Sequence, residues 1–262
     1  MSYYVMSDIH GCYDELIDML KIINFSDHDI LICAGDYIDR GKQSYEMLKW
    51  IENKHSNIIL VKGNHEQEFV KNIDIMQIIA TQFDKEYYDN NNTKKLYGIV
   101  KKLSDQNGSL FDYYETIWQM VRENNVSLNE LITWKTLINK MPFYYNFKIN
   151  NRECIVVHAG YIESLDNVET EDKFDSLEDF YLYARDDAYM YGGKQHSIIL
   201  SGHTPTIFCE EIPYNNGNVY HMYDNEMDCD FYNIDCGSAY RTVKKEAKLA
   251  CIRIDDMKIF YR

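Results

Sequence analysis

The amino-acid sequence predicts an α/β fold built around a largely parallel sheet. Short apolar runs suited to strands occur at Tyr3–Met6, 30–34 and 58–61. Between them lie two segments with apolar residues at helical spacing, 13–23 and Ser44–Asn53. Strands that alternate with helices in this way pair in parallel, with right-handed crossovers. Ligands of such sheets gather beyond the carboxyl ends of the strands.

The rest of the chain divides into a helical middle and a strand-rich second half. Residues 66–139 are mainly helical in pattern, apart from a polar stretch at 84–95 that we expect to be a loop. Further strands, several of them in hairpins, are expected at 143–149, 154–158, 197–200, 207–212, 219–223, 231–234, 249–254 and 258–261. We predict one domain, 1–262, in which about 67–140 form a helical insertion or cap over the site.

Composition and charge narrow the classes of partner. Lys and Arg number 27 against 42 Asp and Glu, a net charge of −15, so nucleic-acid backbones and anionic membranes are not expected partners. The N-terminal residues show no signal-peptide pattern, and no stretch of about 18 apolar residues could span a bilayer. The seven scattered cysteines lack a CxxC spacing, which favours reduced thiols. We therefore expect a cytoplasmic protein.

Five short motifs place metal-binding side chains beside glycine at or near strand ends. They are Asp8-Ile9-His10-Gly11, Gly35-Asp36-Tyr37-Ile38-Asp39-Arg40-Gly41, Gly63-Asn64-His65-Glu66, Val157-His158-Ala159-Gly160 and Ser201-Gly202-His203-Thr204. Glycine lets the backbone turn tightly and approach a ligand. Oxygen and imidazole donors in this mixture suit Mn, Fe, Zn or Ni better than Ca²⁺. A single Asp-x-His would occur by chance, whereas five motifs in series predict a metal site.

In order and spacing these motifs resemble the phosphoprotein phosphatase family of calcineurin-like metallophosphoesterases, and the compact bacterial and bacteriophage type most. The tail Ile234-Asp235-Cys236-Gly237 resembles the closing strand segment of that family. The resemblance implies a β-sandwich flanked by helices and a serine/threonine protein phosphatase. Its substrate would be a phosphorylated protein or a small phosphoester.

Residue by residue, the resemblance also implies the metal ligands. Two divalent ions are expected, with Mn²⁺ preferred and Fe, Zn or Ni as alternatives. Asp36 would bridge both ions. The first ion would be completed by Asp8 and His10, and the second by Asn64, His158 and His203. A hydroxide activated by the ions would attack phosphorus in line.

The remaining catalytic roles follow from the same resemblance. His65 would be the general acid, oriented by Asp39, and Arg40 would bind the phosphoryl oxygens. A second phosphate-binding arginine is expected at Arg185, although Arg185 could equally be the surface ion-pair partner of an adjacent aspartate. Ser7 departs from the family pattern, which usually has glycine before the first aspartate.

Two other functions stay open at this stage. Symmetrical dinucleoside tetraphosphatases begin with a very similar segment, which residues 12–16 match (CYDEL). They tend to lack an acidic residue at the position of Asp39 and to end the third motif in Asp, whereas this chain has Glu66; these differences favour a protein phosphatase. A non-catalytic interaction module would typically have lost a ligand or His65, and none is missing.

Overall fold

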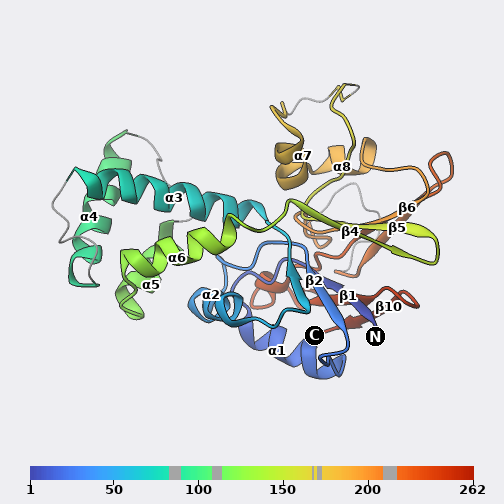
Figure 1. Ribbon diagram of the computed structural model, residues 1–262, viewed down its shortest axis with the longest axis horizontal. Helices are drawn as coiled ribbons and strands as arrows, with labels where there is room; N and C mark the ends of the chain where they lie inside the picture. The colour runs from blue at the N-terminus through green and yellow to red at the C-terminus, as the bar shows by residue number, and fades with distance from the viewer. Residues whose placement is uncertain (83–89, 108–113, 167, 170–172, 209–216) are drawn as a thin grey trace.

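The computed structural model describes residues 1–82, 90–107, 114–166, 168–169, 173–208 and 217–262 (Figure 1). Two five-stranded sheets form its centre. Helices α1 (Tyr13–Ile22) and α2 (Ser44–Asn53) lie on the outer side of the first sheet. Helices α7 (Leu177–Tyr183) and α8 (Asp186–Met190) lie on the outer side of the second.

The first sheet contains the three parallel strands predicted from the N-terminal third. Its order is β10 (Lys258–Tyr261), β9 (Ala250–Arg253), β1 (Tyr3–Met6), β2 (Ile30–Cys33) and β3 (Ile58–Leu60). Tyr3 lies opposite Ile30 in the parallel pair of β1 and β2. Strands β2 and β3 are also parallel, whereas β9 is antiparallel to β1.

The second sheet repeats this plan with strands from the second half. Its order is β4 (Tyr144–Ile149), β5 (Arg152–Val157), β6 (Ser197–Ser201), β8 (Cys229–Asn233) and β7 (Tyr220–Asp224). Strands β5, β6 and β8 are parallel, and the edge strands β4 and β7 pair antiparallel to their neighbours. Each sheet thus brings the carboxyl ends of three parallel strands to one edge.

Alternating side chains explain why the two sheets pack together. Val5 and Ile32 of the first sheet share one buried cluster with Val156 and Leu200 of the second. The intervening Leu31 packs instead with the helices outside the first sheet. Burying an aliphatic side chain of this size contributes roughly 1.5–3 kcal/mol, so these positions hold the sheets face to face. The predicted α/β sandwich flanked by helices is confirmed.

The middle of the chain forms a group of helices at one side of the molecule (Figure 1). They are α3 (Asn64–Thr81), α4 (Asn90–Asn107), α5 (Tyr114–Glu123) and α6 (Leu128–Ile138). Met76, Leu131 and Trp134 are buried in the same apolar cluster as residues of α1 and α2. The group is therefore packed against the helices of the first sheet, while its assignment as an insertion or cap of one domain stays a prediction.

Two expectations about local structure were wrong. Residues 83–89 lie outside the described part, but 90–95 begin helix α4 instead of a loop, because Leu96 and Val100 extend a buried apolar face at helical spacing. The strand expected at 207–212 is absent at 207–208, where a turn is closed by the Phe208 amide donating to the Pro205 carbonyl over 2.9 Å. Residues 209–212 lie outside the described residues.

Two further observations concern cysteines and membrane spans. Within the described ranges six cysteines are free thiols, namely Cys12, Cys33, Cys154, Cys229, Cys236 and Cys251. None of the helices in the described part combines the length and apolar character needed to cross a bilayer.

Candidate active site

Five of the predicted site residues lie immediately beyond parallel strands. Asp8, Asp36 and Asn64 follow β1, β2 and β3 of the first sheet. His158 and His203 follow β5 and β6 of the second. The His203 amide donates to Asp8 Oδ2 over 3.0 Å, so a hydrogen bond ties the two sheets at their common edge. Packing the sheets face to face is what brings these residues together.

One group of metal-competent atoms is formed by Asp36, Asn64, His158 and His203. Asn64 Oδ1 lies 2.9 Å from His158 Nε2 and 3.0 Å from His203 Nδ1. The two imidazole nitrogens are 3.1 Å apart, and Asp36 Oδ1 lies 3.4 Å from His158 Nε2. All four side chains are buried. Their converging lone pairs match the donor set of a transition-metal ion.

A second group lies on the other side of Asp36. Asp36 Oδ2 is 3.4 Å from His10 Nε2 and 3.7 Å from His65 Nε2. Asp8 Oδ1 is 3.9 Å from the same His10 nitrogen. Two His/Asp groups able to hold metal ions therefore share Asp36, an arrangement that fits a dinuclear site.

Hydrogen bonds to backbone carbonyls place the lone pairs of two imidazoles on the nitrogens that face the metal-competent groups. Nδ1 of His10 lies 2.9 Å from the Ile38 carbonyl, and Nδ1 of His158 lies 2.8 Å from the Ala34 carbonyl. A carbonyl only accepts, so each Nδ1 carries the proton and each Nε2 bears the lone pair. Within the described residues the buried Nε2 of His10 has no hydrogen-bond partner. A cation at this position would satisfy that nitrogen.

The charges of the site also favour cations. Burial raises the pKa of Asp8 well above its usual value, and the Asp235 and Asp36 carboxylates raise it further. For His10 and His203, burial lowers the pKa well below the ordinary range and keeps the imidazoles neutral. Burial also acts to raise the pKa of Asp36, but attraction to the nearby imidazoles, His158 and then His65, outweighs burial and lowers that pKa. Crowded carboxylates beside neutral imidazoles are what divalent ions stabilise.

The backbone at the site is held in an uncommon conformation. The φ angles of Asp8, His10, Asp36 and His203 lie between 47° and 68°, in the left-handed region that L-residues seldom occupy. Such strain persists where surrounding structure enforces it, and it clusters at functional sites. Gly202 is required for close approach, because a Cβ there would lie 1.9 Å from Asp8 Oδ2.

His65 and its neighbours form a hydrogen-bonded chain beside the second group. His65 Nδ1 lies 2.6 Å from Asp39 Oδ2, and its Nε2 lies 3.3 Å from Nη2 of Arg40. Burial acts to lower the pKa of His65, but the Asp36 and Asp39 carboxylates outweigh it, so the pKa is raised. The imidazole is held with Nε2 toward Asp36, where it could deliver a proton.

Arg185 lies beside the loop that carries His203. Its Nη1 is 3.3 Å from Thr204 Oγ1 and 3.5 Å from the His203 carbonyl oxygen. Its positive charge acts to lower the pKa of His203, after burial and His158. Arg40, in the loop after β2, and Arg185, at the start of α8, thus place guanidinium groups beside His65 and beside His203.

Two buried acids at the site received no role from the sequence. Glu66 accepts hydrogen bonds from the amides of Asp36 at 2.8 Å, Tyr37 at 2.9 Å and Gly63 at 3.1 Å. It therefore shapes the turn that carries Asp36. Burial raises the pKa of Asp235, which follows β8, to about 7, and its Oδ2 has no partner in the described residues. Its position after a parallel strand was the signal that could have identified it.

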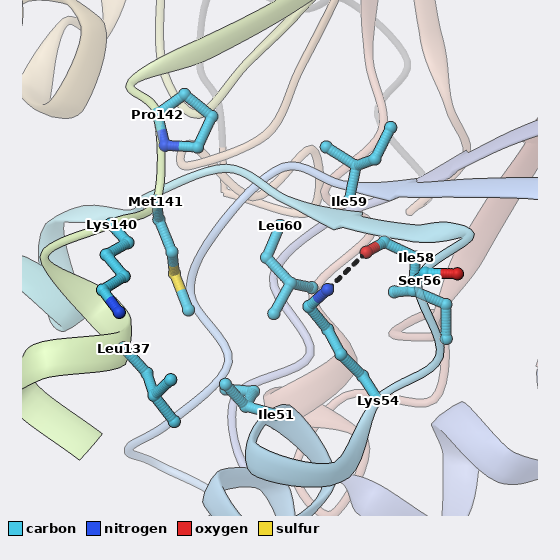
Figure 2. Close-up of a pocket in the computed structure, with 10 residues that line it drawn as sticks. All are labelled: Ile51, Lys54, Ser56, Ile58, Ile59, Leu60, Leu137, Lys140, Met141 and Pro142. Carbon is cyan, nitrogen blue, oxygen red and sulfur yellow. Dashed lines mark hydrogen bonds between the residues drawn. The ribbon is translucent and has the colours of Figure 1, made fainter. Parts of the chain in front are cut away.

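A separate apolar cavity of about 370 Å³ lies at the edge strand β3, between α2 and the end of α6 (Figure 2). Ile51, Leu60, Leu137 and Met141 line it. Lys54 is drawn there with its ammonium donating to the Ile58 carbonyl over 2.7 Å. The described residues that line it include no Asp, Glu, His or Cys, in contrast to the strand-end site.

The fold and the paired His/Asp groups define a metallophosphoesterase, a hydrolase of phosphoesters. The chain belongs to the calcineurin-like phosphoesterase family, whose model matches residues 1–236. A symmetrical bis(5'-nucleosyl)-tetraphosphatase of Wigglesworthia glossinidia brevipalpis is 32% identical over 168 residues, which cover 63% of this chain and 47% of that relative. One of the same name from Vibrio parahaemolyticus is 43% identical over 67 residues, 25% of each chain. The matched part is thus less than half of each relative.

Solved structures share the fold at low identity. A protein provisionally named a diadenosine tetraphosphatase superposes with a TM-score of 0.54 and 15% identity, covering 99% of this chain and 92% of its own. A protein serine/threonine phosphatase from Saccharomyces cerevisiae superposes with a TM-score of 0.53 and 13% identity. The match covers 100% of this chain and 79% of that protein. These similarities support the fold but do not distinguish the two activities. The two curated relatives are named as symmetrical tetraphosphatases, whereas the motifs resemble those of protein phosphatases.

Proposed function

We propose that this protein hydrolyses dinucleoside tetraphosphates symmetrically. The observation that carries the proposal is the 32% identity with a symmetrical tetraphosphatase over 63% of the chain. The paired His/Asp groups and the two flanking arginines provide a site of suitable chemistry for a polyphosphate. Protein dephosphorylation is the second candidate, favoured by the hydrogen-bonded pair of Asp39 and His65.

The site would hold two divalent ions, with Mn²⁺ first among Mn, Fe, Zn and Ni. Asp36 would be shared, Asp8 and His10 would complete one ion, and Asn64, His158 and His203 the other. When bound, the pair of ions supplies an activated water and neutralises charge on the phosphoryl group. The positions of these side chains determine where the ions bind. The backbone carbonyls that hold the protons of His10 and His158 on Nδ1 keep the Nε2 lone pairs available to the ions.

The remaining side chains would act directly on the substrate. Arg40, beside His65, and Arg185, beside His203, bind phosphoryl oxygens and so align the scissile bond. In its doubly protonated form His65 would donate the Nε2 proton to the leaving oxygen, once Arg40, whose Nη2 contacts Nε2 here, has turned to the phosphoryl group; Asp39 positions the imidazole through Nδ1. Glu66 holds the Asp36 turn through three backbone amides.

Steady-state kinetics on two substrates tests the proposal. We expect kcat/KM for diadenosine tetraphosphate to exceed that for a phosphoserine peptide by about 100-fold, since only the former fills contacts beyond the reacting phosphate. His158→Ala should abolish both activities, which assigns them to this site. A higher kcat/KM on the peptide would overturn the assignment in favour of a protein phosphatase.

A further inference from the structure

An exposed aromatic surface continues outward from the candidate site. Tyr240 ends a 3₁₀ turn, Ser238–Tyr240, that follows Asp235. The Phe208 ring packs edge-on against Tyr240, with centroids 4.8 Å apart and planes at 81°. Phe208 is 46% exposed, so one of the two rings is open to solvent. We call Phe208 and Tyr240 the aromatic platform.

Cations connect the aromatic platform to the catalytic groups. The Arg40 guanidinium lies 5.6 Å from the centroid of the Tyr240 ring, while the same side chain contacts His65 Nε2 at 3.3 Å. Lys244 Nζ lies 5.6 Å from the centroid of the Phe208 ring. An acidic chain with a net charge of −15 therefore presents two cations and an open aromatic ring side by side at this rim.

The platform is held in place by the loops that carry the site. The Thr206 amide donates to the Asp235 carbonyl over 2.8 Å, which joins the loop after β6 to the loop after β8. A Cβ at Gly237 would lie 2.5 Å from Ile207 Cδ1, so the two loops also pack closely. His203 and Phe208 lie on the first loop, and Asp235 and Tyr240 on the second. The platform therefore has a fixed position relative to the phosphate-binding groups.

We infer that the aromatic platform binds a nucleobase of the substrate while Arg40 binds its phosphate chain. The inference rests on the proposed function, and it assigns Phe208 and Tyr240 as determinants of specificity for nucleotides over other phosphoesters. Any base offers a π-face, so aromatic stacking is tolerant of base identity. Lys244 would contribute charge beside the stacked base or its phosphates.

Calorimetric binding to the Mn²⁺-loaded protein isolates the base from the phosphates. We expect Phe208→Ala to weaken ADP binding about tenfold or more, and to leave inorganic pyrophosphate binding unchanged. Phe208→Trp should retain ADP affinity. Tyr223→Ala is the matched control. Tyr223 is also 46% exposed, but it pairs with Asp230 in the β7–β8 hairpin, near the turn and away from the end of β8 that leads to Asp235.

The possible outcomes separate this inference from the proposed function. Selective loss of ADP binding in Phe208→Ala supports the platform even if diadenosine tetraphosphate is not hydrolysed. Equal ADP affinity in wild type and variant overturns it, whatever the substrate. Equal weakening of ADP and pyrophosphate also overturns it, because Phe208 would then act on the site as a whole.

Discussion

Asp36→Asn is expected to remove both metal ions and to reduce activity by about 10³-fold or more. Residues that only hydrogen-bond to a metal ligand typically cost about 10–100-fold when they are changed. One Asp36 oxygen lies 3.4 Å from His158 Nε2 and the other lies 3.4 Å from His10 Nε2. The Asn amide offers one neutral oxygen and an NH₂ group that only donates, so it cannot serve both groups. Elemental analysis of the purified protein should fall from two ions per chain to fewer than one.

Asp18→Asn provides the control for this substitution. Asp18 is an exposed aspartate of α1 whose carboxylate pairs with Lys21 and Arg262. Its variant should keep two ions and full activity. An Asp36→Asn protein that is folded and still holds two ions would show that Asp36 is not shared.

Substituting His65 is the second change with a large expected effect. His65→Asn should lower kcat by about 10² to 10⁴ on an unactivated phosphoester while leaving the metal content unchanged. Phenyl phosphate leaves as a basic phenolate and needs a proton, whereas p-nitrophenyl phosphate leaves as a stabilised anion and needs it less. The variant should therefore lose more activity on phenyl phosphate. Asp39→Asn should show a weaker version of the same difference.

The pH profile gives an independent readout of the same role. A general acid must be protonated, so kcat should fall as pH rises through the raised pKa of His65. That basic limb should disappear in His65→Asn. His196→Asn is the matched control, because His196 also pairs with an aspartate, Asp228 at 2.5 Å, but is exposed. Equal losses on both aryl esters would leave His65 with a positioning role only.

The local part of the fold was predictable because its signals are local. Each motif follows a short apolar run, and parallel pairing of β1, β2 and β3 brings Asp8, Asp36 and Asn64 to one edge. The sequence could not specify that a second sheet would face the first across Val5 and Val156, since that depends on packing between distant segments. The strand predicted at 207–212 was wrong at Phe208 because hydrophobicity alone does not separate a strand from an exposed aromatic turn.

Long-range contacts also explain the residues that were missed. Glu66 was part of a motif, but its three amide donors come from Gly63 and from a turn 30 residues earlier in the chain. Tyr240 reaches Arg40 across 200 positions of sequence. The choice between a protein phosphatase and a tetraphosphatase was likewise not fixed by Asp39 and Glu66, since both enzymes need the same metal-binding groups.

Product analysis of diadenosine tetraphosphate hydrolysis tests the central claim most directly. Protein stripped of metal by chelation is incubated with the substrate, before and after Mn²⁺ is added, and the nucleotides are separated by ion-exchange chromatography. A symmetrical metal-dependent hydrolase should give ADP as the sole nucleotide product, and only after Mn²⁺ is restored. Equal amounts of AMP and ATP, or full turnover in the metal-free protein, would contradict it.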